Sequence, residues 1–517
     1  MKKQLLAAGL AAALLLSGCG ASGEASSAAL GQYADAQTLL LSDSGVTLNG
    51  QDLSPESQGA VTVSHDIVYY RDGTDSSYGE GTEADMHSAR EAGAHTVVTI
   101  REAGVYRVSG ALSAGQLAVD LGEEARRDPE AVVTLVLDGV DITCTVAPAV
   151  IFYNVYECDE AWVAYDEGET EDYTLSPTDV DTSAAGANVV LAGGSLNQIS
   201  GSYVARIYKE GTDKKLHKYD GAFYSKMSMN IDGEKDGTLT ITAENEGLDS
   251  ELHLTVNAGQ IYIQSQNDGI NTNEDNVSVT TINGGVLEIN AGLGEEGDGI
   301  DSNGHIIING GSVRSAASDH SPDGGLDADG EILINGGSVI AAGMRSDAVS
   351  TDSAQLYMEL SFASSLSAGS QVELEGSPLS FSLEKGAQSL ILSSPELKED
   401  TAYTLKVNGE VQQYTGHVGG MAAGGFRPGE PPQGDFQPQD GTEPPQRPEG
   451  GQEPPDGQEP PKFPEGMEPP DGREPPADRP QRPDGGGRGS LEEETAAGTE
   501  FTLTDGVRSF SGITSQT

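Results

Sequence analysis

Asn257-Ala-Gly259, Asn283-Gly-Gly285, Asn309-Gly-Gly311 and Asn335-Gly-Gly337 are four copies of one short pattern, each beginning 26 residues after the one before. A pattern that returns at a fixed interval indicates a repeat architecture. Apolar and polar residues alternate on both sides of each copy, which predicts short strands flanking a glycine turn. One copy is too small to bury its own apolar face, so we expect successive copies to stack in register.

Aligning the copies on Asn produces apolar columns along the stack. Because connections between parallel strands are nearly always right-handed, the predicted fold class is all-β, a right-handed parallel β-helix with turns of about 26 residues. The Asn column is expected to form an amide ladder, each side chain bonding to the copies above and below it. The two apolar columns are Val256, Ile282, Ile308 and Ile334 before the Asn, and Ile261, Leu287, Val313 and Val339 after it.

A second pattern follows the same repeat and places oxygen-bearing side chains two residues apart. If the Ile or Leu of each copy points inward, the Asp or Asn residues beside it point outward together, because side chains alternate along a strand. Stacking then produces two acidic columns. The copies are Gly247-Leu-Asp-Ser-Glu251, Gly269-Ile-Asn-Thr-Asn273, Gly299-Ile-Asp-Ser-Asn303, Gly325-Leu-Asp-Ala-Asp329 and a degraded Ala348-Val-Ser-Thr-Asp352.

The spacing of such columns favours a bound cation. Adjacent strands lie ~4.8 Å apart and same-face neighbours ~6.6 Å apart, so four side chains can enclose an ion at the ~2.3 to 2.6 Å that Ca²⁺ prefers. Without an ion, the stacked carboxylates of Asp301, Asp327 and Asp329 would repel one another. Hard oxygen donors, with no Cys and no consistent His column, argue against zinc or copper. The alternative is a hydrated acidic face.

Composition limits the choice of partners. The 517-residue chain has 28 Lys and Arg against 82 Asp and Glu, a net charge of −54, which repels nucleic acid and anionic membrane and attracts cations. Three Cys residues exclude a disulfide scaffold, and the sequence leaves open whether Cys144 and Cys158 form a disulfide. We expect the single Trp162 to be part of a core rather than a sugar platform.

The N-terminus predicts export. Lys2 and Lys3 precede an apolar run that is too short to span a bilayer, and Leu16-Ser-Gly-Cys19 resembles the lipobox of bacterial lipoproteins. That resemblance implies cleavage and lipidation at Cys19, hence a protein on the extracellular face of the cell membrane that touches the membrane only through its lipid. The alternative is a plain secretory signal with a chance Cys.

Changes of composition divide the chain further. Residues 355–418 alternate well but lack the 26-residue interval, which predicts a small antiparallel β cap, since a solenoid needs a different unit to cover its last rung. Residues 419–498 are rich in Pro, Gly and acidic residues and are expected to be disordered. The predicted organisation is 1–19 signal peptide, 20–60 flexible linker, 61–354 β-helix, 355–418 cap, 419–498 disordered segment, and 499–517 a terminal strand that joins the cap.

Basic and aromatic residues are interleaved in residues 203–226. Aromatic rings can stack on sugars, and cations can pair with uronate carboxylates, so this stretch is a candidate carbohydrate-binding segment. The alternative is a loop whose basic residues neutralise the neighbouring acidic columns. The candidate contacts are Tyr208, Lys209, Lys218, Tyr219, Tyr224 and Lys226.

Together, the Asn-Gly-Gly turns, the Asp298-Gly-Ile-Asp-Ser-Asn303 rung, the lipobox and Leu392-Ser-Ser-Pro-Glu-Leu397 resemble bacterial carbohydrate-binding surface lipoproteins with a pectate-lyase-like parallel β-helix. The resemblance covers roughly 61–414. It implies binding of cellulose or a uronate polymer and calcium held on the helix. The positions matching the family's calcium ligands are Asp301, Asn303, Asp327 and Asp329, and with them Asn271 and Asn273, where amides replace carboxylates.

Catalysis is the main competing function. Calcium-dependent β-elimination on a uronate needs a Lys or Arg as base. Arg345 and Arg314 are the weak candidates, and Arg314 is expected to pair with Glu288 one rung below. We therefore expect a non-catalytic, monomeric, calcium-dependent carbohydrate-binding lipoprotein, with a polysaccharide lyase and a structural or adhesive envelope protein as alternatives.

Overall fold

Strand dominates the computed structural model, which describes residues 33, 35–55, 58–170, 180–208, 215–419, 494–504 and 507–516. About 50% of the chain is strand and about 4% helix, so the all-β class is confirmed. The described residues belong to one unit formed by residues 1–423 and 493–517. The predicted signal peptide, including Cys19, lies outside the described residues, and so does Lys209. All but the ends of the predicted disordered segment also lie outside them.

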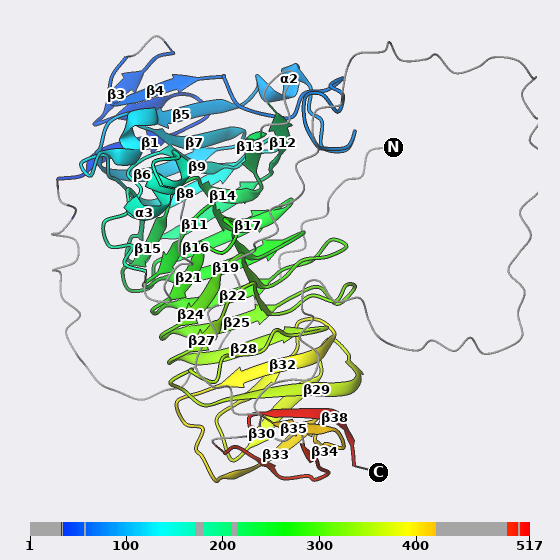
Figure 1. Cartoon of the computed structure of the whole chain (residues 1–517). Coiled ribbons are helices and arrows are strands. Elements are labelled where there is room, and N and C mark those ends of the chain that lie inside the picture. Colours follow the sequence, from blue (N-terminus) through cyan, green and yellow to red (C-terminus); the bar gives the residue numbers. More distant parts are fainter. Residues whose placement is uncertain are drawn as a thin grey trace, which may run out of the picture. The chain divides into compact units, whose positions relative to one another are not determined.

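Three series of parallel strands form the main body (Figure 1). The first is a nine-stranded sheet in which all neighbours are parallel except β4 and β5. Its strands are β4 (Val61–Ser64), β5 (Thr96–Ile100), β7 (Gly115–Asp120), β9 (Val150–Asn154), β14 (Gly221–Ser225), β17 (Glu246–Ser250), β20 (Ile270–Thr272), β23 (Ile300–Ser302) and β26 (Leu326–Ala328).

The second and third series begin on shared long strands. β8 (Val133–Thr143) pairs through its first half with β10 and through its second half with β11. The second series runs β1 (Gln37–Leu41), β6 (Gly104–Leu112), β8, β10 (Ala187–Leu191), β15 (Met229–Gly233), β18 (Leu254–Val256), β21 (Val279–Ile282), β24 (His305–Ile308) and β27 (Ile332–Ile334). The third continues from β8 as β11 (Leu196–Gly201), β16 (Thr238–Ala243), β19 (Gln260–Ser265), β22 (Val286–Asn290), β25 (Ser312–Ala316) and β28 (Ser338–Gly343).

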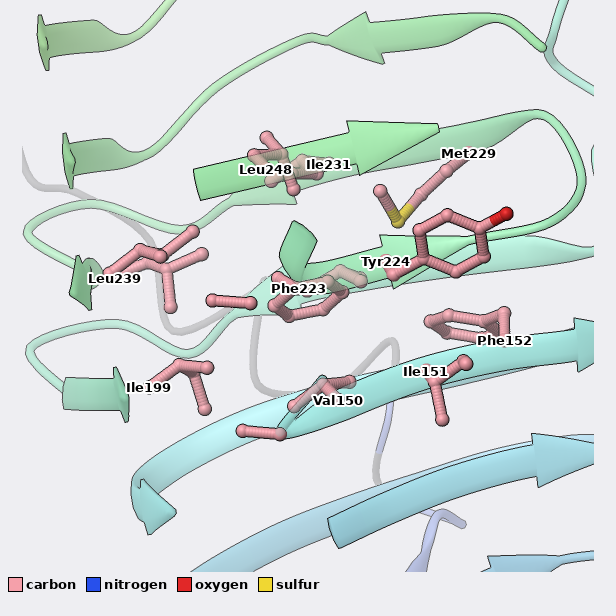
Figure 2. Close-up of a cluster of buried hydrophobic side chains, with 14 of the residues drawn as sticks. Val150, Ile151, Phe152, Ile199, Phe223, Tyr224, Met229, Ile231, Leu239 and Leu248 are labelled. Atoms are coloured by element: carbon pink, nitrogen blue, oxygen red, sulfur yellow. The ribbon is translucent and has the colours of Figure 1, made fainter. Parts of the chain in front are cut away.

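The observed register matches the columns read from the sequence. Ile308 pairs with Ile282 on one side and Ile334 on the other, and Val313 lies between Leu287 and Val339. All of these side chains are fully buried, as the alternation predicts. A continuous core therefore runs between the strand series, and Figure 2 shows part of it, with side chains of β9, β11, β14, β15, β16 and β17 packed together.

The predicted Asn ladder is confirmed. Asn283 donates to Asn257 and Asn309 to Asn283, both at 2.9 Å, and Asn335 donates to Asn309 at 3.0 Å. The last glycine of each turn has a positive φ, 83° at Gly311, which favours glycine. The middle glycine is required by stacking, because a Cβ on Gly310 would lie 2.5 Å from the carbonyl oxygen of Asn283.

A mainly antiparallel module, in which β29 (Tyr357–Leu366) and β38 (Ser509–Ser515) pair in parallel, follows β28. Its strand β32 (Ala387–Ser393) pairs antiparallel with β28, and the terminal β38 returns to pair with β29. The module has its own apolar core. Its other strands are β30 (Gln371–Glu375), β31 (Ser380–Ser382), β33 (Ala402–Val407), β34 (Glu410–Gln413), β35 (His417–Gly419), β36 (Glu494–Thr495) and β37 (Phe501–Thr502).

One predicted boundary is wrong. Regular structure begins at β1 rather than near Val61, so the stretch predicted as a linker to residue 60 is too long. β1 pairs in parallel with β6 and buries Leu39 and Leu41, and it is followed by β2 (Val46–Leu48) and β3 (Gln51–Leu53). A run of three leucines with a short flanking pattern carried too little alternation to be recognised as a strand.

The remaining elements are short helices and a hairpin. They are α2 (Ala89–Ala92), a 3₁₀ helix η1 (Glu123–Arg127), α3 (Glu160–Asp166), and the antiparallel pair β12 (Val204–Tyr208) and β13 (Lys215–Tyr219). Trp162 on α3 is buried, as expected, with the Arg126 guanidinium 4.6 Å from its ring centroid. Cys144 and Cys158 are both free thiols. No helix in the described part of the chain has the length and apolarity needed to cross a membrane.

Candidate functional site

One face of the nine-stranded sheet carries a column of oxygen-bearing side chains. Asp249 pairs in register with Asn271, Asn271 with Asp301, and Asp301 with Asp327, one residue on each of β17, β20, β23 and β26. The preceding Leu or Ile on each strand is fully buried in the core, which directs the next side chain to the other face. We call these four residues the first acidic column.

The second predicted column follows each strand. The N–H of Asn273 donates to the Ser250 carbonyl at 3.1 Å, and the N–H of Asp329 to the Ser302 carbonyl at 3.0 Å, so these residues continue the stacking. Asn303 directs its amide nitrogen to the Asn273 carbonyl and to Asp275, each at 2.8 Å. The predicted quartet of Asp301, Asn303, Asp327 and Asp329 therefore lies on two neighbouring rungs.

A third acidic column was missed. Glu246, Asp268 and Asp298 each precede the glycine of a copy, and they lie on successive rungs. One carboxylate oxygen of Asp268 accepts the N–H of Asp298 at 2.7 Å, and one of Asp298 accepts the N–H of Gly324 at 2.6 Å. Extending the aligned copies by one residue toward the N-terminus would have found this column.

The first and third columns meet at Glu246, Asp249 and Asn271, whose exposed fractions are 4%, 0% and 5%. Two short amide contacts fix their orientation: Asn271 Nδ2 donates to Glu246 Oε1 at 3.1 Å, and Asn273 Nδ2 donates to Asp249 Oδ1 at 2.7 Å. The other three oxygens, Glu246 Oε2, Asp249 Oδ2 and Asn271 Oδ1, are buried and receive no hydrogen bond from the described residues.

Buried acceptor oxygens without a donor are costly unless a proton or a cation satisfies them. The protein without metal can answer by protonation: burial, followed by the charge of Asp220, raises the pKa of Glu246 to about 8, and burial followed by Glu246 raises the pKa of Asp249 well above its usual value. A hard cation would satisfy the same oxygens in their ionised form.

Raised pKa values continue along the sheet. Burial, and after it the charge of Glu246, raises the pKa of Asp268 to about 8. Burial and Asp327 raise the pKa of Asp298 to about 9, and burial with the charge of Asp268 raises that of Asp301 to about 8. The columns thus form a strip of crowded carboxyl groups that is buried at Glu246 and Asp268 and more open to solvent at Asp301 and Asp329.

Two basic residues lie at the ends of the strip. Lys218 Nζ is 3.2 Å from Asp220 and donates a hydrogen bond to Asn273 Oδ1 at 3.0 Å. Burial alone would lower the pKa of Lys218, but the negative charges of Asp220, Glu246 and nearby carboxylates outweigh burial and raise it. Arg345, at the other end, forms an ion pair with Asp327. Each end of the strip therefore has a cation supplied by the chain itself.

These contacts change the status of several predicted ligands. The amide oxygen of Asn273 is engaged by Lys218, and Asp327 is engaged by Arg345, so both would have to give up a partner to bind metal. Of the six predicted metal ligands, Asn271 has a buried side-chain oxygen without a donor. Glu246 and Asp249, which were not predicted, present the other two.

The donor set fits calcium. Carboxylate and amide oxygens are the ligands that Ca²⁺ takes, and it completes its coordination with backbone oxygens and water. Among the described residues, no three Asp, Glu, His or Cys side chains converge closely enough to hold a metal by themselves. An ion beside Glu246 and Asp249 would therefore need the Asn271 amide oxygen as well.

The predicted sugar-binding segment is only partly accessible. Tyr219 and Tyr224 are buried, the latter inside the core in Figure 2, so the prediction that these two rings stack on sugar is wrong. Lys218 pairs with Asp220 and donates to Asn273, so it partly neutralises the acidic columns, which is the alternative considered for this segment. Tyr208 is half-buried on β12, and the Lys226 side chain is exposed. Alternating aromatic and basic residues could not reveal which side of each strand faces the core.

Both candidate bases lie beside carboxylates. Arg345 forms an ion pair with Asp327. Burial lowers the pKa of Arg345, but the negative charges of Asp327 and nearby carboxylates together outweigh burial, and the pKa is raised. Arg314 lies opposite Glu288 in the register of β22 and β25, but within the described ranges it forms no ion pair closer than 4.0 Å. The predicted ladder salt bridge between Arg314 and Glu288 is therefore a neighbouring pair rather than a direct contact.

Fold and site define an all-β protein of stacked parallel strands with a partly buried acidic strip. The model of a family described as carbohydrate-binding domain-containing protein matches residues 94–179 and 173–390, more than half of the chain, so the protein belongs to this family. No curated protein shows significant similarity to it. A solved structure, that of the polysaccharide lyase-like protein from C. thermocellum as its gadolinium derivative, is similar at 20% identity and a TM-score of 0.34, over 58% of this chain and 92% of that one.

Proposed function

We propose that this protein is a non-catalytic carbohydrate-binding protein of the bacterial cell surface that holds calcium on its acidic columns and uses it to bind acidic polysaccharide. Family membership supports carbohydrate binding. The observation that carries the calcium part is the set of three buried oxygens of Glu246, Asp249 and Asn271, which lack donors among the described residues.

The proposed winding of the chain is a right-handed parallel β-helix. From β17 to β28 each passage of the chain adds one strand to each of the three parallel series, in the same order. Right-handed connection is nearly universal between parallel strands. This winding stacks the acidic columns along one sheet, which is what a chain of cation sites on a polymer-binding surface requires.

The charge balance explains why a cation is needed. A chain with a net charge of −54 repels a polyuronate, and the carboxylates of the strip add local repulsion. Calcium held by the half-buried Asp301, Asn303 and Asp327 and the exposed Asp329 would leave open coordination positions that a sugar carboxylate can occupy, whereas an ion at the buried Glu246, Asp249 and Asn271 would stabilise the fold. Glu246, Asp249 and Asn271 would hold one ion, and Asp301, Asn303, Asp327 and Asp329 remain the predicted ligands further along the sheet.

Lipidation at Cys19 would place the protein on the extracellular face of the membrane. This part of the proposal is based on the sequence, because Cys19 lies outside the described residues. Metabolic labelling with a fatty-acid analogue tests it: labelled wild-type protein and unlabelled Cys19→Ser protein are expected, and equal labelling of both would refute lipidation.

A polysaccharide lyase is the second candidate, favoured by the position of Arg345 beside the first acidic column. Its partner Asp327 stabilises the charged guanidinium, whereas a base must be able to take up a proton. The ion pair therefore makes binding the better interpretation. Absorbance of unsaturated uronate products, absent in our proposal, decides between the two.

Co-sedimentation with insoluble glycans tests binding directly. We expect the protein to sediment with covalently crosslinked polygalacturonate in calcium but not in chelator, and soluble oligogalacturonate to compete in calcium. Failure to sediment with any glycan would leave the structural or adhesive alternative. Asp52→Asn, which changes an exposed acid on β3, is the matched control for variants in the strip.

A further inference from the structure

A groove of about 580 Å³ that includes none of the acidic-strip residues in its lining lies between the segment that follows β4 and the hairpin of β12 and β13. That size is in the range of small-molecule sites. Seven of its eleven lining residues fall in residues 66–78, which precede the part of the chain that the family model matches. Its lining includes three tyrosines, one histidine, one arginine and one aspartate: Tyr69, Tyr78, Tyr208, His217, Arg71 and Asp66.

The two walls are joined by backbone hydrogen bonds. The N–H of Tyr208 donates to the Tyr78 carbonyl and that of Glu80 to the Arg206 carbonyl, each at 2.7 Å. The Arg206 guanidinium and Glu80 carboxylate are 2.7 Å apart, and the Tyr208 hydroxyl donates to the same carboxylate. A Cβ on Gly79 would lie 2.0 Å from the Arg206 carbonyl oxygen, so the walls meet as closely as the backbone allows.

The groove offers ring faces beside polar groups. Tyr69, Tyr78 and Tyr208 are half-buried, so part of each ring remains open to solvent. The Arg71 guanidinium lies 5.8 Å from the Tyr78 ring centroid, and it forms no ion pair within the described ranges. Leu216 at the hairpin adds apolar surface with 47% of its area exposed.

Charge in the groove is balanced. Arg71 and Asp66 contribute opposite charges, and His217 is neutral, because burial, and then the charge of Lys226, lowers its pKa to about 4. The His217 ring nitrogen Nδ1 is 2.7 Å from the Tyr219 hydroxyl, which fixes the imidazole. Such a site has no surplus positive charge with which to overcome a net charge of −54 and attract a polyanion.

We infer that this groove is a second, calcium-independent carbohydrate site that binds a neutral pyranose oligosaccharide. The tyrosine rings stack on the apolar faces of the sugar, and Arg71 and Asp66 hydrogen-bond its hydroxyl groups. This inference rests on the proposed carbohydrate-binding function and adds a site that recognises a different sugar charge.

Isothermal titration of the full chain in chelator tests the site, with cellopentaose and mannopentaose as neutral probes and tetragalacturonate as the acidic probe. We expect at least one neutral probe to bind and tetragalacturonate not to bind. Tyr208→Ala and Arg71→Gln should each weaken binding about tenfold or more. Tyr262→Ala is the matched control, because Tyr262 lies on β19 with 37% of its surface exposed, outside the groove lining.

The outcomes separate this inference from the proposed function. If the neutral probes do not bind while calcium-dependent polyuronate binding persists, the groove inference is wrong and the proposed function stands. Loss of both would refute the proposed function. Neutral binding that survives Tyr208→Ala and Arg71→Gln, or preferential binding of tetragalacturonate in chelator, would also overturn the inference. Arg71→Gln, at an exposed side chain, retains a readout if Tyr208→Ala fails to fold.

Discussion

Replacing Asp249 with asparagine should shift the melting temperature in opposite directions with and without calcium. Asparagine keeps the side-chain oxygen that accepts the Asn273 amide at 2.7 Å, so the change mainly removes charge. In chelator, the loss of a buried carboxylate beside Glu246 should stabilise the fold. In calcium, the loss of a ligand should destabilise it.

The magnitude follows from the repulsion between the carboxylates of Asp249 and Glu246, both on β17. Two unit charges ~5 Å apart repel by ~3 kcal/mol at an effective dielectric constant of ~20. Partial protonation reduces this figure, so the gain in chelator is at most ~3 kcal/mol. Calcium at a hundred times its dissociation constant stabilises by ~2.7 kcal/mol, which the variant would lose.

Differential scanning calorimetry in chelator and in millimolar calcium measures both effects. At ~1 to 2 °C per kcal/mol for a domain larger than 250 residues, shifts of a few degrees with opposite signs are expected. Asp52→Asn should shift neither curve. Shifts of the same sign in both buffers would refute the proposal that a cation occupies this place.

Three further predictions concern the fold and its charges. Ile308→Asp should unfold the strand stack, because Ile308 is fully buried and the variant loses ~1.5 to 3 kcal/mol of apolar burial besides burying a charge. The control Ile340→Asp, at a half-buried position, should destabilise the fold less. Equal melting temperatures for the two variants would contradict the register. In chelator, the free energy of unfolding should fall as pH rises from about 4 to about 9. The folded pKa values of Asp301 and Asp298, about 8 and about 9, lie above their unfolded values, so their contribution to stability is present at low pH and is lost as they ionise. Urea unfolding at several pH values measures this, and stability that rises with pH would contradict it. Deleting residues 420–492 should change the melting temperature by only a few degrees, because β35 and β36 on either side of the deletion pair with each other; a large drop would mean that the segment packs on the fold.

Sequence periodicity predicted the features that depend on stacking. The apolar columns, the Asn ladder and the first acidic column all follow from residues that return at the same position in each copy. Asp301 and Asp327 pair in register for the same reason that Ile308 and Ile334 do. A one-residue error would have turned every one of these side chains to the other face.

Contacts that break the periodicity could not be predicted in this way. Arg345 meets Asp327 from a position only 18 residues away, and Lys218 reaches Asn273 from a hairpin that interrupts the strand series. The groove between residues 66–78 and the hairpin likewise joins segments far apart in sequence. Tyr224 was misassigned because an aromatic residue suits both a sugar platform and a core.

Oligogalacturonate binding to calcium-loaded protein is the measurement that tests the central claim most directly. Wild type is compared with the double variant Asp301→Asn, Asp329→Asn, which keeps the shape of both accessible side chains and removes their charge. We predict that titration calorimetry detects binding to wild type in calcium, no binding in chelator, and at least about tenfold weaker binding to the double variant. Equal affinity for the two proteins, or binding that persists in chelator, would contradict a calcium-dependent carbohydrate site on the acidic columns.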